Sequence, residues 1–133
     1  MTKETIQEND IFSLYYYPQY GIIHHEVHTN IYGEAFKTML TAGADMFIKN
    51  RCNKWLSNDK SSQKPQTEDL IWAYDNWKDR VVNHGWKYWA LVMPDRMTGQ
   101  IDMQKIAIGF TGLGVEVQTF NNPDMALTWL KKA

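Results

Sequence analysis

Two aspartates and an arginine follow predicted strands at positions where an α/β sheet can bind a ligand. Asp59 comes shortly after a strand predicted over residues 52–57, and the pair Asp95-Arg96 follows a strand predicted over residues 85–94. In an open α/β sheet, ligands bind outside the carboxyl ends of the strands. If these two strands are neighbours, both carboxylates and the guanidinium share one cleft, where they bind a polar group or carry out acid–base chemistry.

Ser57 and Asn58 precede Asp59 directly and would add a hydroxyl and an amide to this cleft. The candidate residues for binding a ligand or partner at these strand ends are therefore Ser57, Asn58, Asp59, Asp95 and Arg96. The competing interpretation is structural. In it, the aspartates cap turns, and the arginine forms an ion pair that only stabilises the fold.

Residues 24–28, with the sequence HHEVH, look like a metal-binding motif. They are one residue short of the His-Glu-x-x-His zinc signature, which needs a helix to place both histidines on one face. Residues 20–28 favour a strand instead, in which His24 and His28 stand about 13 Å apart at ~3.3 Å per residue. One zinc ion cannot join ligands that far apart, because its bonds are about 2 Å long. We therefore predict histidines on a strand surface and no metal site.

Residues for nucleophilic catalysis or cofactor binding are sparse. Cys52 is the single cysteine, and it opens a predicted interior strand, where a thiol is usually an inert small hydrophobic group. The sequence holds no Gly-x-Ser-x-Gly elbow, no phosphate-binding glycine loop and no dinucleotide-binding fingerprint. We therefore predict no catalytic residues and no cofactor, and an enzyme is less favoured than a binding protein.

Aromatic residues gather in two parts of the chain. Most of these large rings should be buried in the core. Three successive tyrosines cannot all point inward, however, and Trp72 lies at the edge of the apolar stripe of its predicted helix. We therefore expect a partly exposed aromatic surface, which often marks an interface or an apolar pocket, and add Trp72 to the candidate binding residues. The two groups are Tyr15, Tyr16, Tyr17, Tyr20 and Tyr32, and Trp72, Trp77, Trp86 and Trp89.

These residues must be positioned by a sheet built around residues 85–94, GWKYWALVMP. This strand is apolar on both faces, which is typical of an interior strand that is covered on both sides. Residues 10–17 and 20–28 are rich in β-forming residues, and the Pro-Gln-Tyr-Gly turn between them predicts an antiparallel hairpin. Further strands are predicted over residues 52–57 and 115–120.

Helices are predicted between the strands and after the last one. Asn30, Thr67 and Asn122 are suitable N-caps, and Pro123 suits the first position of the last helix. The predicted order is ββαβαβαβα. Strands separated by helices imply right-handed crossovers and a parallel sheet, to which the first strand is an antiparallel addition.

Composition places these elements in one domain. Residues 1–9 form a polar N-terminal segment, and residues 10–133 form a single domain whose 44% hydrophobic share provides ample burial. The net charge of −1 gives no basic field for nucleic acid or an anionic membrane. The polar start has no apolar signal-peptide region, and no apolar run approaches the roughly 20 residues of a spanning helix. We expect a cytoplasmic protein that does not insert into membranes.

With this order of elements, the chain resembles the SpoIIAA-like domains, and more narrowly the small bacterial proteins labelled as containing a STAS or SEC14 domain. The residues that carry the resemblance are 54–59 (KWLSND), 85–90 (GWKYWA) and the end of the chain from 113–115 to 129–130. The resemblance implies a SpoIIAA-like α/β fold with a five-stranded mixed sheet and about four helices. It also implies a binding or regulatory module before an enzyme.

The chain departs from STAS proteins at one functional position. Those that antagonise anti-sigma factors carry an Asp-Ser-(Ser/Thr)-Gly string whose serine is phosphorylated. The corresponding residues 57–62 read SNDKSS here, without the glycine. We therefore do not transfer the phosphorylation switch to Ser61 or Ser62.

The first prediction for function is a non-enzymatic module that binds a protein partner or a second copy of itself. The alternative is a protein that binds a small apolar, lipid-like ligand, with a polar rim at Asp59, Asp95 and Arg96. An enzyme that uses these residues comes third. A cavity of roughly several hundred Å³ would favour the ligand-binding protein, whereas an exposed apolar patch without a deep pocket would favour the interaction module.

Overall fold

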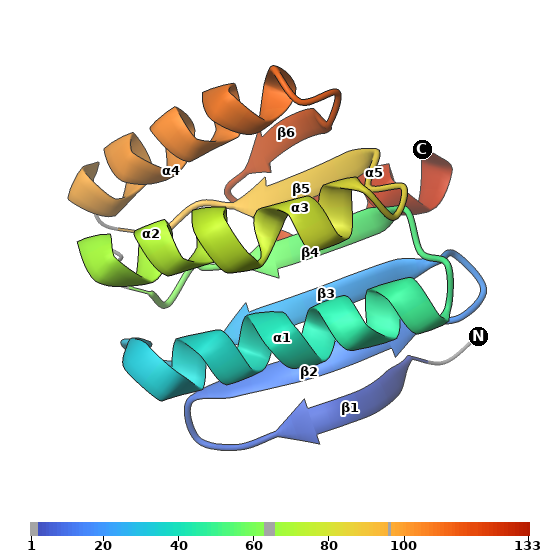
Figure 1. Ribbon diagram of the computed structural model, residues 1–133, viewed down its shortest axis with the longest axis horizontal. Coiled ribbons are helices and arrows are strands. Elements are labelled where there is room, and N and C mark those ends of the chain that lie inside the picture. Colours follow the sequence, from blue (N-terminus) through green and yellow to red (C-terminus); the bar gives the residue numbers. More distant parts are fainter. Residues whose placement is uncertain (1–2, 63–65, 96) are drawn as a thin grey trace.

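In the part of the chain that the structure describes, a single mixed sheet of six strands organises the protein (Figure 1). The computed structural model describes residues 3–62, 66–95 and 97–133. The spatial order of the strands is their order in the chain; the pairings β1–β2 and β2–β3 are antiparallel, and the three later pairings are parallel. The strands are β1 (Glu4–Glu8), β2 (Phe12–Tyr17), β3 (Ile22–Val27), β4 (Lys54–Asn58), β5 (Tyr88–Val92) and β6 (Glu116–Phe120).

Helices cover both faces of this sheet, but unequally. Each parallel connection adds the next strand along the sheet, so the right-handed crossovers all return on one face. Figure 1 shows α1 to α4 in front of the sheet and α5 behind it. The helices are α1 (Gly33–Lys49), α2 (Thr67–Asn76), α3 (Lys78–Val82), α4 (Met97–Thr111) and α5 (Pro123–Lys132).

The α/β class, the N-terminal antiparallel hairpin and the later parallel strands confirm the prediction from sequence, but the strand number was wrong. The sheet has six strands because Glu4–Glu8, within the polar segment 1–9, pairs with β2 as an edge strand. Ile6 alone of its side chains packs against the core, so the segment has no period-2 apolar pattern to reveal it. Polar residues are common on edge strands, where they oppose pairing with another chain.

The helix predicted after Thr67 is two helices in the structure, which makes five in the described chain instead of about four. The break lies at Trp77, whose buried indole Nε1 donates a hydrogen bond to the carbonyl of Leu40 in α1 at 3.0 Å. Tyr74 was expected on the inner stripe but is 60% exposed. The ammonium of Lys78 lies 3.6 Å from the centre of its ring.

The helix starts were predicted with mixed success. Asn122 is the N-cap of α5, as expected, and its side chain accepts hydrogen bonds from the next backbone N–H groups. The first helix begins at Gly33 instead of just after Asn30, and Thr67 is the first residue of α2 instead of its cap. Tyr32 occupies the cap of α1 and makes no side-chain capping bond. The backbone N–H groups at the N-terminus of α1 therefore need a hydrogen-bond acceptor from another part of the chain.

The larger core lies under α1 to α4 and centres on Trp55 of β4, which is fully buried. Its indole contacts Phe47, Trp77 and Trp86, with ring centroids 5.2–6.1 Å apart. Gly43 of α1 lies directly over this ring: a Cβ there would stand 2.5 Å from the Cη2 atom of Trp55. The helix therefore approaches the sheet closely only because this position has no side chain.

Alanine substitutions at two helical glycines should change stability in opposite directions. Gly43→Ala forces a methyl group into a packed indole ring and should lower the free energy of unfolding by about 1–3 kcal/mol. A Cβ at Gly109 of α4 would meet no atom within 4 Å, so Gly109→Ala should raise it by about 0.5–1 kcal/mol. Urea unfolding of both variants tests this, and two changes of the same sign would contradict it.

Candidate ligand-binding site

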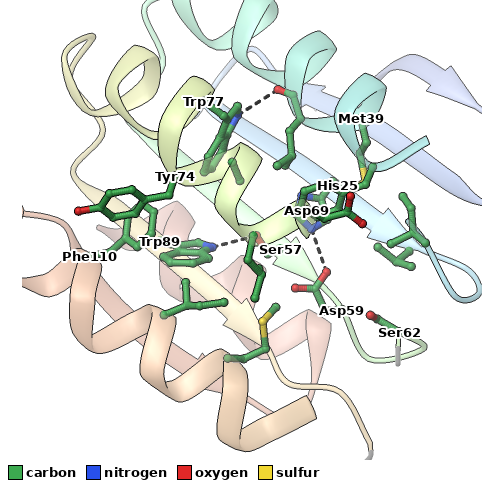
Figure 2. A pocket seen from close by; sticks show the side chains of 18 of the residues that line it. His25, Met39, Ser57, Asp59, Ser62, Asp69, Tyr74, Trp77, Trp89 and Phe110 are labelled. Carbon is green, nitrogen blue, oxygen red and sulfur yellow. Dashed lines mark hydrogen bonds and ion pairs between the residues drawn. The ribbon is translucent and has the colours of Figure 1, made fainter. Parts of the chain in front are cut away.

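A partly enclosed cavity of about 420 Å³ lies between the sheet and helices α1, α2 and α4 (Figure 2). Its volume falls in the range of small-molecule sites, which is roughly 300–1,000 Å³. Strands β3, β4 and β5 bring side chains of one face to this space, and the helices cover it with their apolar stripes. Its walls are mostly apolar and include Met39, Leu40, Trp77, Trp89, Met103 and Phe110.

A hydrogen-bonded chain connects two side chains of the cavity wall, His25 and Asp59, to the core residue Trp55. Trp55 Nε1 lies 3.1 Å from His25 Nδ1, and His25 Nε2 lies 3.0 Å from Asp59 Oδ1. An indole N–H can only donate, so Nδ1 of the imidazole must accept and carries no proton. The proton of the neutral imidazole is therefore on Nε2, where it donates to the carboxylate. Trp55 thus selects the tautomer that holds Asp59 in place.

Ser57 makes a separate contact in the same wall: Trp89 Nε1 donates to its Oγ at 2.8 Å. Its own hydroxyl proton is not used in that bond. His25 is its neighbour in the β3–β4 register, but both imidazole nitrogens are already bonded, so no base is positioned to activate the serine. Burial raises the pKa of Cys52 to about 12, which leaves a thiol in place of a nucleophilic thiolate. The arrangement suits binding better than acyl transfer.

Asp69, in the first turn of α2, is a second buried carboxylate in the cavity wall. Its two oxygens lie 3.1 and 3.3 Å from the backbone nitrogen of Gly33, so it caps the N-terminus of α1 from a distant part of the chain. A negative charge there is also favourable to the helix dipole. One indirect signal of this role is visible in the sequence, because Tyr32 and Gly33 provide no capping side chain of their own.

The structure divides the candidate residues of strand β4 and its loop between the two faces of the sheet. Ser57 and Asp59 line the cavity. Asn58, between them, does not line it, as expected where successive strand side chains alternate between faces. Its Oδ1 accepts a hydrogen bond from the backbone nitrogen of Lys60, so it organises the turn after the strand.

The other candidate residues do not line the cavity. Asp95 is exposed, and its Oδ1 accepts a hydrogen bond from Lys60 Nζ at 3.0 Å, which ties together the loops after β4 and β5. Arg96 lies outside the described residues. Trp72 is half-buried against the core, with the ammonium of Lys37 5.9 Å from its ring centre. Asp59 lines the cavity and Asp95 does not, so these two carboxylates do not share the cleft that we expected.

The prediction of surface histidines was wrong for two of the three. His24 and His25 are both buried, on opposite faces of β3, because helices and aromatic side chains cover both sides of the sheet. His28 follows the strand and is more exposed; its Nε2 lies 2.7 Å from Ser13 Oγ. Within residues 3–62, 66–95 and 97–133, no group of three or more histidine, cysteine or acidic side chains is placed to hold a metal ion.

Burial of His24 should make folding sensitive to acid. Burial is the main cause that lowers its pKa to about 3, whereas an unfolded histidine titrates near ~6.5. Between these pH values His24 binds a proton in the unfolded chain but not in the folded protein. The free energy of unfolding should therefore fall as the pH drops from about 6.5 to about 3. His24→Phe should make this decline shallower in urea unfolding series. An unchanged slope would contradict the prediction.

Asp59 should matter to stability as the acceptor for His25. Asp59→Ala leaves the buried Nε2–H without its partner and should lower the free energy of unfolding by about 1–3 kcal/mol. Asp59→Asn keeps an acceptor oxygen in the same position and should cost less. Urea unfolding of the two variants distinguishes these outcomes, and equal losses would show that the hydrogen bond is not what Asp59 contributes.

Comparison with known proteins finds no relative that could identify this site. The sequence matches no protein-family model, and it has no significant match among curated proteins or solved structures. The SpoIIAA-like assignment therefore stays a prediction. Among the described residues, no helix combines the length and the apolar character needed to cross a membrane.

Proposed function

We propose that this protein binds a small, largely apolar ligand in the cavity between the sheet and helices α1, α2 and α4. The observation that carries the proposal is the combination of volume and lining: about 420 Å³ of space, mostly apolar walls and a few buried polar side chains. This is the usual composition of a small-molecule site, where the apolar walls supply affinity and the polar groups fix orientation.

Packing energetics support a ligand over an accidental void. Protein interiors are packed as densely as organic crystals, with few spaces larger than a water molecule. Empty apolar space is destabilising in proportion to its volume. Ser57 and Asp59 moreover present polar atoms to this space from the carboxyl end of β4, where α/β sheets bind ligands.

An interaction module is the second candidate, and one observation favours it. Large apolar side chains are exposed on α2 and α4: Ile71 by 56%, Tyr74 by 60% and Ile108 by 75%. A protein partner or a second copy of the chain would cover such side chains. The SpoIIAA-like resemblance implies a regulatory partner. In this second proposal, that partner binds the exposed apolar side chains of α2 and α4.

Fluorescence of N-phenyl-naphthylamine tests the ligand-binding proposal. This neutral, apolar dye emits strongly only in an apolar environment, so the wild-type protein should enhance its emission in a saturable way. Gly109→Leu places a side chain in open space beside the cavity and should weaken binding of the dye at least about tenfold, equivalent to about 1.4 kcal/mol. Gln104→Leu is the matched control: it adds the same side chain to an exposed position of α4 that does not line the cavity.

Three outcomes decide the proposal. Saturable binding that Gly109→Leu weakens and Gln104→Leu spares supports the cavity as the site. Equal weakening by both variants would assign the dye to the surface of α4. No saturable enhancement in the wild type, together with a dimer in light scattering, would overturn the proposal in favour of the interaction module.

A further inference from the structure

We infer that the ligand is a cationic amphiphile, an amine or guanidine whose charged group lies against Asp59 and Asp69 while its apolar body fills the cavity. This inference rests on the proposed function, because it requires the cavity to be a binding site. It adds the chemical class of the ligand, which follows from the hydrogen bonds and charges of the wall.

Two carboxylates in the wall have spare acceptor capacity. Asp59 and Asp69 are only 6% and 5% exposed, and both line the cavity. Asp59 uses Oδ1 to accept from His25, and its Oδ2 accepts no hydrogen bond from the residues that the structure describes. Asp69 shares the single backbone N–H of Gly33 between its two oxygens. A carboxylate offers about four lone-pair sites, so the described residues leave most of them unused.

Neither carboxylate has a cationic partner within the part of the chain that the structure describes. His25 is the one side chain within ion-pair distance of Asp59 among the described residues, and the hydrogen bond from Trp55 keeps that imidazole neutral. Asp69 forms no ion pair with any described residue. Lys105 of α4 also lines the cavity, but it is exposed and pairs with neither carboxylate. Buried charges are normally paired, and the described residues supply no positive charge to either carboxylate.

The rest of the wall suits the apolar part of such a ligand. Figure 2 shows the aromatic side chains of Tyr74, Trp89 and Phe110 on one side of Ser57, and Asp59 and Asp69 on the other. The cavity is therefore polar in one part and aromatic in the other. A ligand with one charged end and one apolar end matches this division.

The charge also discriminates between ligands that have the same apolar body. A fatty acid would bring a third carboxylate to a buried site that already holds two, and like charges in such surroundings repel strongly. An alcohol can donate one hydrogen bond but leaves the charge uncompensated. An ammonium group donates up to three hydrogen bonds and supplies the missing charge.

Displacement of bound N-phenyl-naphthylamine by three octyl compounds tests the inference. At about pH 7 octylamine is cationic, octanol is neutral and octanoate is anionic, while the apolar chain stays the same. Octylamine should displace the dye at a concentration at least about tenfold lower than octanol, and octanoate should be the weakest. In Asp59→Asn the advantage of octylamine over octanol should fall about tenfold, and a cooperative urea transition serves as the check on folding. Asp69→Asn should act in the same direction.

The outcomes separate this inference from the proposed function. If the wild type does not bind the dye, the proposed function fails and takes the inference with it. If the dye binds but all three compounds displace it equally, or octanoate does so best, the cavity is a binding site and the cationic ligand is wrong. An octylamine preference that survives both Asp59→Asn and Asp69→Asn would also overturn the inference, because the charge would not come from these carboxylates.

Discussion

The hydrogen bond from the indole of Trp55 to Nδ1 of His25 is the interaction on which the site depends. Without it, either nitrogen of the imidazole could carry the proton, and the ring could not be a defined donor to Asp59. The indole can make this bond only because it is fixed among other rings and because Gly43 leaves room for it under α1. A close approach of helix to sheet is thus connected, through one ring, to a carboxylate in the cavity.

Hydrogen bonds from indole N–H groups connect the aromatic core to the polar residues of the cavity. Indoles are large apolar groups with a single donor that needs an acceptor when it is buried. Trp77 and Trp86 donate to backbone carbonyls, whereas Trp55 and Trp89 donate to His25 and Ser57. Two of the four donors therefore orient polar residues of the cavity. Removing an indole there changes both packing and the direction of a polar group.

Sequence patterns predicted what depends on neighbours in the chain. The central strand, the hairpin and the cap at Asn122 follow from local residue types, and the rule for strand ends found Ser57 and Asp59. The burial of His25 was missed because a period of two assigns a residue to a face but does not say what covers that face. Asp69 was missed as a cap because its partner, Gly33, is 36 positions away.

The order of the strands has a consequence for the width of the helix layer. Neighbouring strands lie about 4.8 Å apart, whereas packed helices need about 8–10 Å. Each crossover here advances by one strand and returns on the same face, so the helices are wider than the strips of sheet beneath them. α1 lies over β2 and β3, and α4 lies over the edge strand β6, which spreads the layer from β2 to β6 (Figure 1). Helices spread in this way cannot all lie directly over their own strands. The cavity lies in the space between the two layers.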